Sequence, residues 1–329
     1  MKSLSVSKDG TRLLLVVPNS TPLRAAAQAI PGVQREGVQG DLVAFSFPAN
    51  PDNCMALLET FEPGVGKAHE GTVLELTSRY VMLEEALAEK YLTSECLFDH
   101  QLTTAPMSHQ VGALNYCAAR FDAGAKGTAL LMEQGTGKSL VAAGMANKLH
   151  ADGDIGWVMV LCPNSLKGTW GAVDGEILKH NGRGTQYPVV LRGDRDKKQA
   201  HLQRVLNNRL GRDYLPWVIT NFDEFAVDIR NGSNADRFRH TLDIIKAAEP
   251  ALLVVDESSS CKNWKAKRTK AVMALSQAFP FRLILTGTPV ECSPLDIWPQ
   301  FEILEPGCLG YKSALAFEKA HAVYERRMV

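Results

Sequence analysis

The sequence predicts an α/β fold in which helices cover both faces of a mainly parallel β-sheet, preceded by a small α+β domain. From about residue 105, short apolar runs alternate with segments rich in helix-forming residues. Within these runs apolar residues are continuous, which is typical of strands buried on both faces. A Gly-rich turn follows the first run and two adjacent acids follow the fifth. These observations place a ligand site at the carboxyl ends of the strands.

Length and composition favour a globular protein of about two domains, at roughly 150 residues per domain. Hydrophobic residues make up 45% of the 329 residues and charged residues 22%. The N-terminus, MKSLSVSKDG, lacks the apolar core of a signal peptide, and no apolar run approaches the length of a membrane span. The seven cysteines are scattered without a CxxC pair. We therefore expect a cytoplasmic protein with reduced thiols and neither a disulfide framework nor a zinc site.

The first domain is expected to span residues 1–98. The run RLLLVVP ends at Pro18 and LVAFSFP ends at Pro48, and both have the apolar character of buried strands. Between them Thr21 is expected to cap a helix that has Pro22 at its first position. The expected order is strand 12–18, helix 21–30, strand 41–48, a helix from residue 51 and helical sequence across 80–92.

The second domain is expected to span residues 99–329. Its strands are predicted at the six apolar runs: 128–132, 157–163, 188–192, 217–220, 251–257 and 282–289. Residues 1–100 carry 8 Lys/Arg and 13 Asp/Glu, whereas the rest of the chain carries 28 and 23. A phosphate-binding surface is therefore expected in the second domain.

A phosphate-binding loop follows the first of these strands, in MEQGTGKSLV. The glycines let successive backbone amides point at one polyphosphate, and the helix that follows adds the partial positive charge of its N-terminus. Lysine reaches the β- and γ-phosphates, and the serine hydroxyl can bind Mg²⁺. Met132 stands where the GxxxxGK[ST] pattern has its first glycine, and the alternative is a Gly-rich turn that only caps a helix. The expected phosphate-binding set is Gly135, Thr136, Gly137, Lys138 and Ser139.

The run ALLVVDE delivers two carboxylates at the end of a buried strand. A packed core disfavours two adjacent charges without partners. We expect Asp256 to hold Mg²⁺ and Glu257 to act as general base, on a strand next to that of the phosphate loop. The alternative is a strand that ends in solvent with both acids hydrated.

GTGKS, VVDESSSCKN and LTGTP, in this order, resemble helicase superfamily two, and most closely its Swi/Snf-type double-stranded DNA translocases. Further similar segments are PMSHQVGALNY, CPNSLKGTW, ITNF and PLDIWPQFEILEPG, so that the resemblance covers roughly residues 105–310. It implies a P-loop RecA-like lobe, binding and hydrolysis of ATP, and a DNA partner. It also implies that Gln110 reads adenine and that Thr286 and Thr288 couple the nucleotide to the DNA track.

Two departures from the family are evident. Ser258 and Ser259 replace the Ala-His that usually follows the acids, and we expect a serine hydroxyl to bond Thr286 or Thr288. No sequence after residue 310 resembles a second RecA-like lobe, which in the family carries the arginine fingers. We therefore expect a monomer that binds ATP, hydrolyses it poorly, and needs a second lobe in cis or in trans.

Residues after the strand ends are candidates for nucleic-acid contacts, because amide, hydroxyl and ammonium groups bind the phosphate backbone. A basic run after the acids contains Trp264, which can stack on bases. The alternatives are a solvated helix face for the basic run and ordinary turn chemistry for Pro-Asn-Ser. The candidates are Asn164, Lys167, Thr220, Asn221, Lys262 and Lys265.

The N-terminal segments 12–18, 21–32 and 42–48 are similar to the small domains that precede the motor in fork-remodelling helicases. This similarity implies recognition of a DNA substrate or docking of a partner. The leading hypothesis is a DNA-dependent ATPase lobe that acts on duplex or branched DNA in replication, recombination or repair. The alternatives are a nucleotide-gated DNA- or protein-binding module without turnover, and an RNA helicase lobe.

Overall fold

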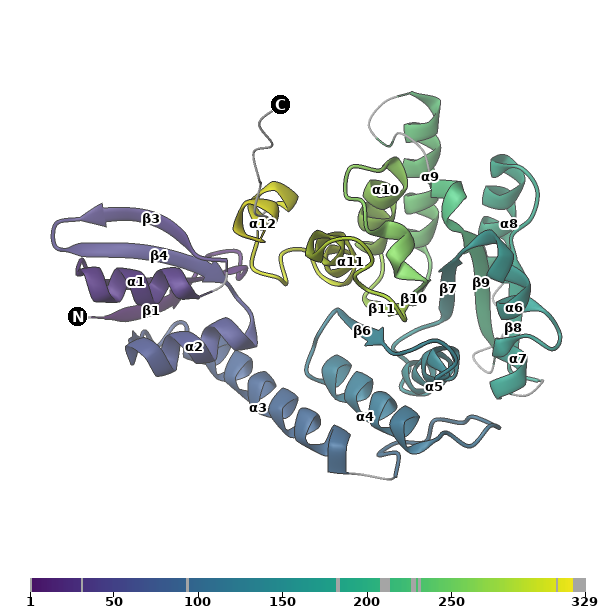
Figure 1. The fold of residues 1–329 in the computed structure, drawn as a ribbon, viewed down its shortest axis with the longest axis horizontal. Helices are drawn as coiled ribbons and strands as arrows, with labels where there is room; N and C mark the ends of the chain where they lie inside the picture. The colour runs from purple at the N-terminus through teal and green to yellow at the C-terminus, as the bar shows by residue number, and fades with distance from the viewer. Residues whose placement is uncertain are drawn as a thin grey trace. The chain divides into compact units, whose positions relative to one another are not determined.

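A computed structural model describes residues 2–30, 32–92, 95–181, 184–207, 214–225, 229, 232–311 and 313–321. The chain forms two compact units, one of residues 1–87 together with 307–329 and the other of residues 88–306 (Figure 1). The division falls before the expected boundary at residue 98, and the end of the chain groups with the smaller unit. Among the described residues, no helix is both long and apolar enough to span a membrane.

The smaller unit is a five-stranded mixed sheet with strand order β3-β4-β2-β1-β5. Its strands are β1 (Ser3–Val6), β2 (Arg12–Pro18), β3 (Gln34–Gln39), β4 (Leu42–Pro48) and β5 (Gly64–Val65). Its helices are α1 (Thr21–Ala29), α2 (Pro51–Phe61), most of α3 (Glu70–Leu92) and α12 (Ala314–His321).

Alternation along β2 and β4 builds the core of this unit. Leu13, Leu15 and Val17 are fully buried, and they pack with Phe45 and Phe47 and with apolar residues of α1, α2 and α3. The expected strands 12–18 and 41–48 and the helices from residues 21 and 51 are present. The N-cap of α1 is Ser20, one residue before the expected Thr21.

The larger unit contains a six-stranded, all-parallel sheet with strand order β6-β11-β10-β7-β9-β8. Its strands are β6 (Gly127–Leu131), β7 (Trp157–Cys162), β8 (Gln186–Val190), β9 (Leu215–Asn221), β10 (Ala251–Asp256) and β11 (Phe281–Thr286). The six strands match the six apolar runs of the sequence, so the prediction of a parallel α/β sheet is confirmed.

Helices cover both faces of this sheet, and the alternate residues of each strand divide between two cores. One core packs under α4 (Ser108–Asp122), α5 (Lys138–Ala151), α6 (Lys167–Gly171) and α7 (Glu176–Asn181). The other packs under α8 (Arg195–Asn207), α9 (Ser233–Ala247), α10 (Lys267–Ser276) and α11 (Ile297–Leu304). Because all six strands are parallel, their carboxyl ends gather at one edge of the sheet.

Short 3-10 helices follow several of these strand ends. They are η1 (Asn164–Leu166), η2 (Phe222–Phe225), η3 (Ser258–Cys261) and η4 (Pro294–Asp296). The segments that carry the sequence motifs therefore leave the sheet at the same edge.

Candidate active site

The Gly-rich loop between β6 and α5 has the backbone geometry that a phosphate-binding loop needs. Gly135 and Gly137 adopt φ of 77° and 84°, and Gly137 is the N-cap of α5. Residues that carry a Cβ rarely adopt such φ values, so glycine at these two positions allows the turn. No side chain caps α5, and its first amides therefore remain available to an anion.

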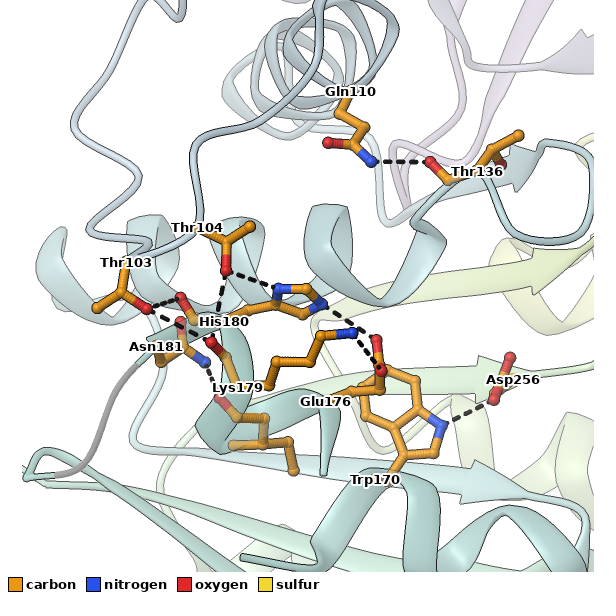
Figure 2. Close-up of polar contacts among 11 residues, drawn as sticks. Thr103, Thr104, Gln110, Thr136, Trp170, Glu176, Lys179, His180, Asn181 and Asp256 are labelled. Carbon is orange, nitrogen blue, oxygen red and sulfur yellow. Dashed lines mark hydrogen bonds and ion pairs between the residues drawn. The ribbon is translucent and has the colours of Figure 1, made fainter. Parts of the chain in front are cut away.

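Gln110, from α4, lies against this loop. Its Nε2 donates to the Thr136 carbonyl over 2.9 Å (Figure 2). Its Oε1 accepts from the backbone N–H of Met107. A Cβ on Gly137 would lie 2.2 Å from Gln110 Nε2, so a larger residue here would push this amide away from the loop. His109 is exposed, and its Nε2 lies 3.0 Å from the same carbonyl.

Lys138 is the first residue of α5, and its side chain turns back toward the loop. The Nζ atom donates to the carbonyls of Met132 and Glu133, each over 3.0 Å. Only 9% of the residue is exposed. A nearly buried cation is thus held in the loop by neutral acceptors, without an anionic partner among the described contacts.

Asp256 ends β10 and is also nearly buried. Its Oδ2 accepts from the indole N–H of Trp170 over 2.7 Å (Figure 2). Its Oδ1 accepts from the backbone N–H of Glu257 over 3.0 Å. Burial raises the pKa of Asp256, while the two N–H donors and the charge of Lys138 oppose the rise. The charge of Lys138 in the phosphate loop therefore favours the ionised form of Asp256.

Glu257 begins the turn after β10 in a left-handed conformation, with φ of 51°. Its pKa is raised, first by burial and then by the Asp256 charge, and Lys138 again opposes the shift. A carboxylate with a raised pKa is a stronger proton acceptor while it remains ionised.

The strand β11 lies between β6 and β10, so the expectation that the acids stand on a strand next to the phosphate-loop strand is wrong. The TGTP loop at the end of β11 therefore borders both parts of the site. Thr286 is buried, and its hydroxyl accepts from the backbone N–H of Thr288 over 3.1 Å. A Cβ on Gly287 would lie 3.3 Å from the backbone nitrogen of Gln134, so the TGTP and phosphate loops are in close contact.

The two serines after the acids bond elsewhere than expected. Ser258 donates to Gln300 Oε1 over 2.7 Å, and Gln300 Nε2 donates to the carbonyls of Pro289 and Asp296. Ser259 bonds Glu291, which also pairs with Lys262. Neither serine bonds a threonine of the TGTP loop in these described contacts.

Gln300 and Trp170 are the site residues that sequence reasoning missed. Gln300 lies in WPQ and Trp170 in GTW, two segments that resemble the family. The residue that each one contacts, however, is distant in the sequence. A polar amide fully buried on the apolar helix α11 is the one local signal, and only for Gln300.

The nucleic-acid candidates divide into exposed and buried residues. Asn164 and Lys265 are exposed and Lys167 and Lys262 are half-buried, with Lys265 Nζ 5.3 Å from the centre of the Trp264 ring. Thr220 and Asn221, in contrast, are buried, because β9 lies inside the sheet and η2 follows it directly. Their side chains are not displayed for a nucleic-acid contact, contrary to expectation.

The described residues fit a magnesium ion bound together with a nucleotide. Mg²⁺ prefers one or two protein oxygens alongside substrate phosphates and water. The Ser139 hydroxyl and the Asp256 carboxylate supply such oxygens beside a loop that suits phosphates. The arrangement can bind a nucleotide triphosphate, neutralise its charge and place a carboxylate near it.

Known proteins resemble parts of this chain. A family model described as the SNF2-related domain matches residues 109–324. The human TATA-binding protein-associated factor 172 is 28% identical over 158 residues, which are 48% of this chain and 7% of that protein. The DNA repair and recombination protein RAD54 of Saccharomyces cerevisiae is 24% identical over 195 residues, which are 58% of this chain and 20% of that protein.

A solved structure, the Sulfolobus solfataricus SWI2/SNF2 ATPase core in complex with dsDNA, shares the fold with a TM-score of 0.50 and 22% identity. The match covers 68% of this chain and 40% of that one. The chain thus spans well under half the length of each of these relatives. Since the family model matches well over half of the chain, the chain belongs to the SNF2-related domain family.

Proposed function

We propose that this chain is the ATP-binding lobe of a DNA-dependent ATPase that translocates on duplex or branched DNA in replication, recombination or repair. The observation that supports it best is one electrostatic arrangement. The ammonium of Lys138 is held in the phosphate loop. Its charge opposes the rise in the pKa of both Asp256 and Glu257 across the intervening strand. A triphosphate and its metal fit between such a cation and such acids.

Each residue of the site has a role in this proposal. Gln110 holds adenine, and the backbone of Gly135, Thr136 and Gly137 holds phosphate oxygens. Lys138 neutralises the β- and γ-phosphates. The Ser139 hydroxyl and Asp256 hold Mg²⁺, which neutralises developing charge on the phosphates when bound. Thr286 and Thr288 pass the nucleotide state toward the DNA.

Glu257 takes the proton of the attacking water in this proposal. Its pKa is raised by burial and by Asp256, and both effects increase its basicity. The backbone N–H of Glu257 is bonded to Asp256, so the two acids keep a fixed orientation. General bases of this kind contribute about 10²- to 10⁴-fold to a rate.

DNA is the proposed partner because one relative is named for DNA repair and recombination and a structural neighbour was solved in complex with duplex DNA. Asn164, Lys167, Lys262 and Lys265 are the proposed contacts, since their segments leave the same edge of the sheet as the nucleotide site. A second RecA-like lobe, in cis or in trans, is proposed to supply an arginine finger worth about 10³- to 10⁵-fold in rate. The smaller unit is proposed to recognise the DNA substrate or dock a partner.

Several relatives are named as TATA-binding protein-associated factors. Their names favour a second candidate, an ATPase lobe that acts on a protein–DNA complex in transcription. The nucleotide chemistry is the same in both cases.

The proposal is tested by nucleotide binding and by the choice of nucleic acid. Lys138→Ala should weaken ATP binding at least tenfold, measured by the fluorescence of a labelled ATP. Lys148→Ala is the matched control, since Lys148 lies on the same helix but pairs with Asp122 and Asp152. Equal affinities for wild type and Lys138→Ala would refute the phosphate site. ATP hydrolysis by the chain, supplied with a second lobe, should rise with duplex or forked DNA, and a response to RNA alone would refute the DNA assignment.

A further inference from the structure

Trp170 makes a polar contact at the candidate metal site that the proposed function does not use. It lies on α6, and 1% of its surface is exposed. Its indole N–H points at the Asp256 carboxylate over 2.7 Å, as Figure 2 shows. The indole nitrogen can only donate, so Oδ2 of Asp256 must be the acceptor and must turn one lone pair toward the indole.

The indole is held rigidly. Its ring stacks on Trp217 of β9, with centroids 6.5 Å apart and planes 27° apart, inside the core that α4 to α7 cover. The other Asp256 oxygen accepts from the Glu257 backbone. Each carboxylate oxygen therefore receives one fixed N–H, which sets the rotation of the carboxylate and the direction of its remaining lone pairs.

We propose that Trp170 is a positioning residue that orients Asp256 for the Mg²⁺ of the bound nucleotide. The inference rests on the proposed function, because it needs Asp256 to hold that ion. Groups that orient a metal ligand typically contribute about 10- to 100-fold to metal affinity. A smaller aromatic residue without the N–H keeps a ring in the core but removes one of the two N–H groups that fix the carboxylate.

The chain offers a matched pair of variants. Trp170→Phe removes the indole N–H at Asp256 and keeps an aromatic ring in the core. Trp217→Phe removes an equally buried indole from the same stack, whose N–H donates instead to Gln186 Oε1 over 2.6 Å. The two variants lose similar packing, so they differ mainly in the bond to Asp256.

The test measures binding of a fluorescent ATP to the complete chain as a function of Mg²⁺. In excess chelator all three proteins should bind the nucleotide equally. With Mg²⁺, Trp170→Phe should require roughly 10- to 100-fold more of the ion than wild type, and Trp217→Phe should match wild type. An unchanged Mg²⁺ requirement in Trp170→Phe would overturn the inference. Failure of wild type to bind nucleotide at all would refute the proposed function instead.

A second measurement needs no variant at position 170. The indole N–H signals of wild type are recorded by ¹H–¹⁵N NMR, with the other four tryptophans assigned by single Phe substitutions. The remaining signal, from Trp170, should shift when Mg²⁺ is added to the nucleotide-bound protein. A Trp170 signal that stays in place would overturn the inference even if Trp170→Phe does not fold.

Discussion

Both the backbone conformation and the packing at position 137 favour glycine. The φ of 84° at Gly137 is costly for a residue with a side chain, and a Cβ would meet the Gln110 amide at 2.2 Å. The same residue caps α5, whose first amides face the phosphate site. A change here should therefore affect both stability and nucleotide binding.

Gly137→Ala should lower the free energy of unfolding by about 1–3 kcal/mol, the range for a residue held in an unfavourable backbone region. It should also weaken ATP binding, because Gln110 must move off the Thr136 carbonyl. Urea denaturation and fluorescence titration measure the two effects. Gly168→Ala is the control, since Gly168 lies in α6 with ordinary φ and open space around its Cβ position. Equal stability of the two variants would contradict the packing argument.

The bond between Glu176 and His180 should make the stability of the fold depend on pH. The Glu176 carboxylate bonds the buried His180 ring over 3.1 Å, and this bond lowers the pKa of Glu176 against the opposing effect of burial. A lowered pKa in the folded state means that the carboxylate stabilises the fold above its ordinary pKa. This stabilisation is lost as the pH falls through the lowered value.

Glu176→Gln should therefore be less stable than wild type by about 1.5–3 kcal/mol at neutral pH, the range for a hydrogen bond to a charged group. The difference should shrink as the pH falls below 4.5. Urea denaturation of both proteins across this pH range measures it. A constant difference between pH 7 and pH 3 would show that the charge of Glu176 does not contribute.

At the scale of elements, Gln300 joins the turn after β10 to the loop after β11. Its side-chain amide is bonded to Ser258 on one side and to the carbonyls of Pro289 and Asp296 on the other. Asp296 in turn accepts from three backbone N–H groups of residues 291–293. The acid-bearing turn and the TGTP loop are thus bridged by a side chain from α11.

Ser258→Ala and Gln300→Leu should not have additive effects on stability. Gln300→Leu leaves several buried polar groups unpaired and should cost about 1–3 kcal/mol or more. The double variant should differ from the sum of the single variants by at least about 0.5 kcal/mol. The pair Ser276→Ala and Gln300→Leu is the control, because the Ser276 hydroxyl bonds Met273 on its own helix. Additivity in both pairs would exclude the bridge.

The strands of the larger unit could be predicted because continuous apolar runs are a local property. The strands β1, β3 and β5 of the smaller unit were not predicted. Gln34–Gln39 is a polar edge strand whose side chains are almost all exposed, so it lacks any hydrophobic period. The phosphate loop and the two acids were located from their motifs, and the structure brings them together. The bonds Trp170–Asp256 and Ser258–Gln300 join residues 86 and 42 positions apart, and no local pattern encodes them.

At the scale of the whole molecule, the two units have separate hydrophobic cores. One is built on β2 and β4 and the others lie on the two faces of the parallel sheet. The proposed nucleotide site lies wholly within residues 88–306. A ligand that binds only the folded form of one unit stabilises that unit alone.

Denaturation of the complete chain should therefore show two transitions. ATP with Mg²⁺ should increase the free energy of unfolding of the larger unit, by about 2.7 kcal/mol at an ATP concentration of 100 times the Kd. The other transition should not move. Trp157, Trp170, Trp217, Trp264 and Trp298 all lie in the larger unit, so tryptophan fluorescence follows it alone and far-ultraviolet circular dichroism follows both. A single transition that shifts as a whole with ATP would contradict independent units.

The position of β11 between β6 and β10 has a mechanical consequence. The backbone of β11 is hydrogen-bonded to the strand that leads to the phosphate loop and to the strand that leads to the acids. Residues 286–288 therefore respond to the spacing between those two strand ends and not to the position of either one alone. Under the proposed function, we expect cleavage of a triphosphate held between these two strand ends to change their spacing, and residues 286–288 to be the part of the backbone that takes up the change.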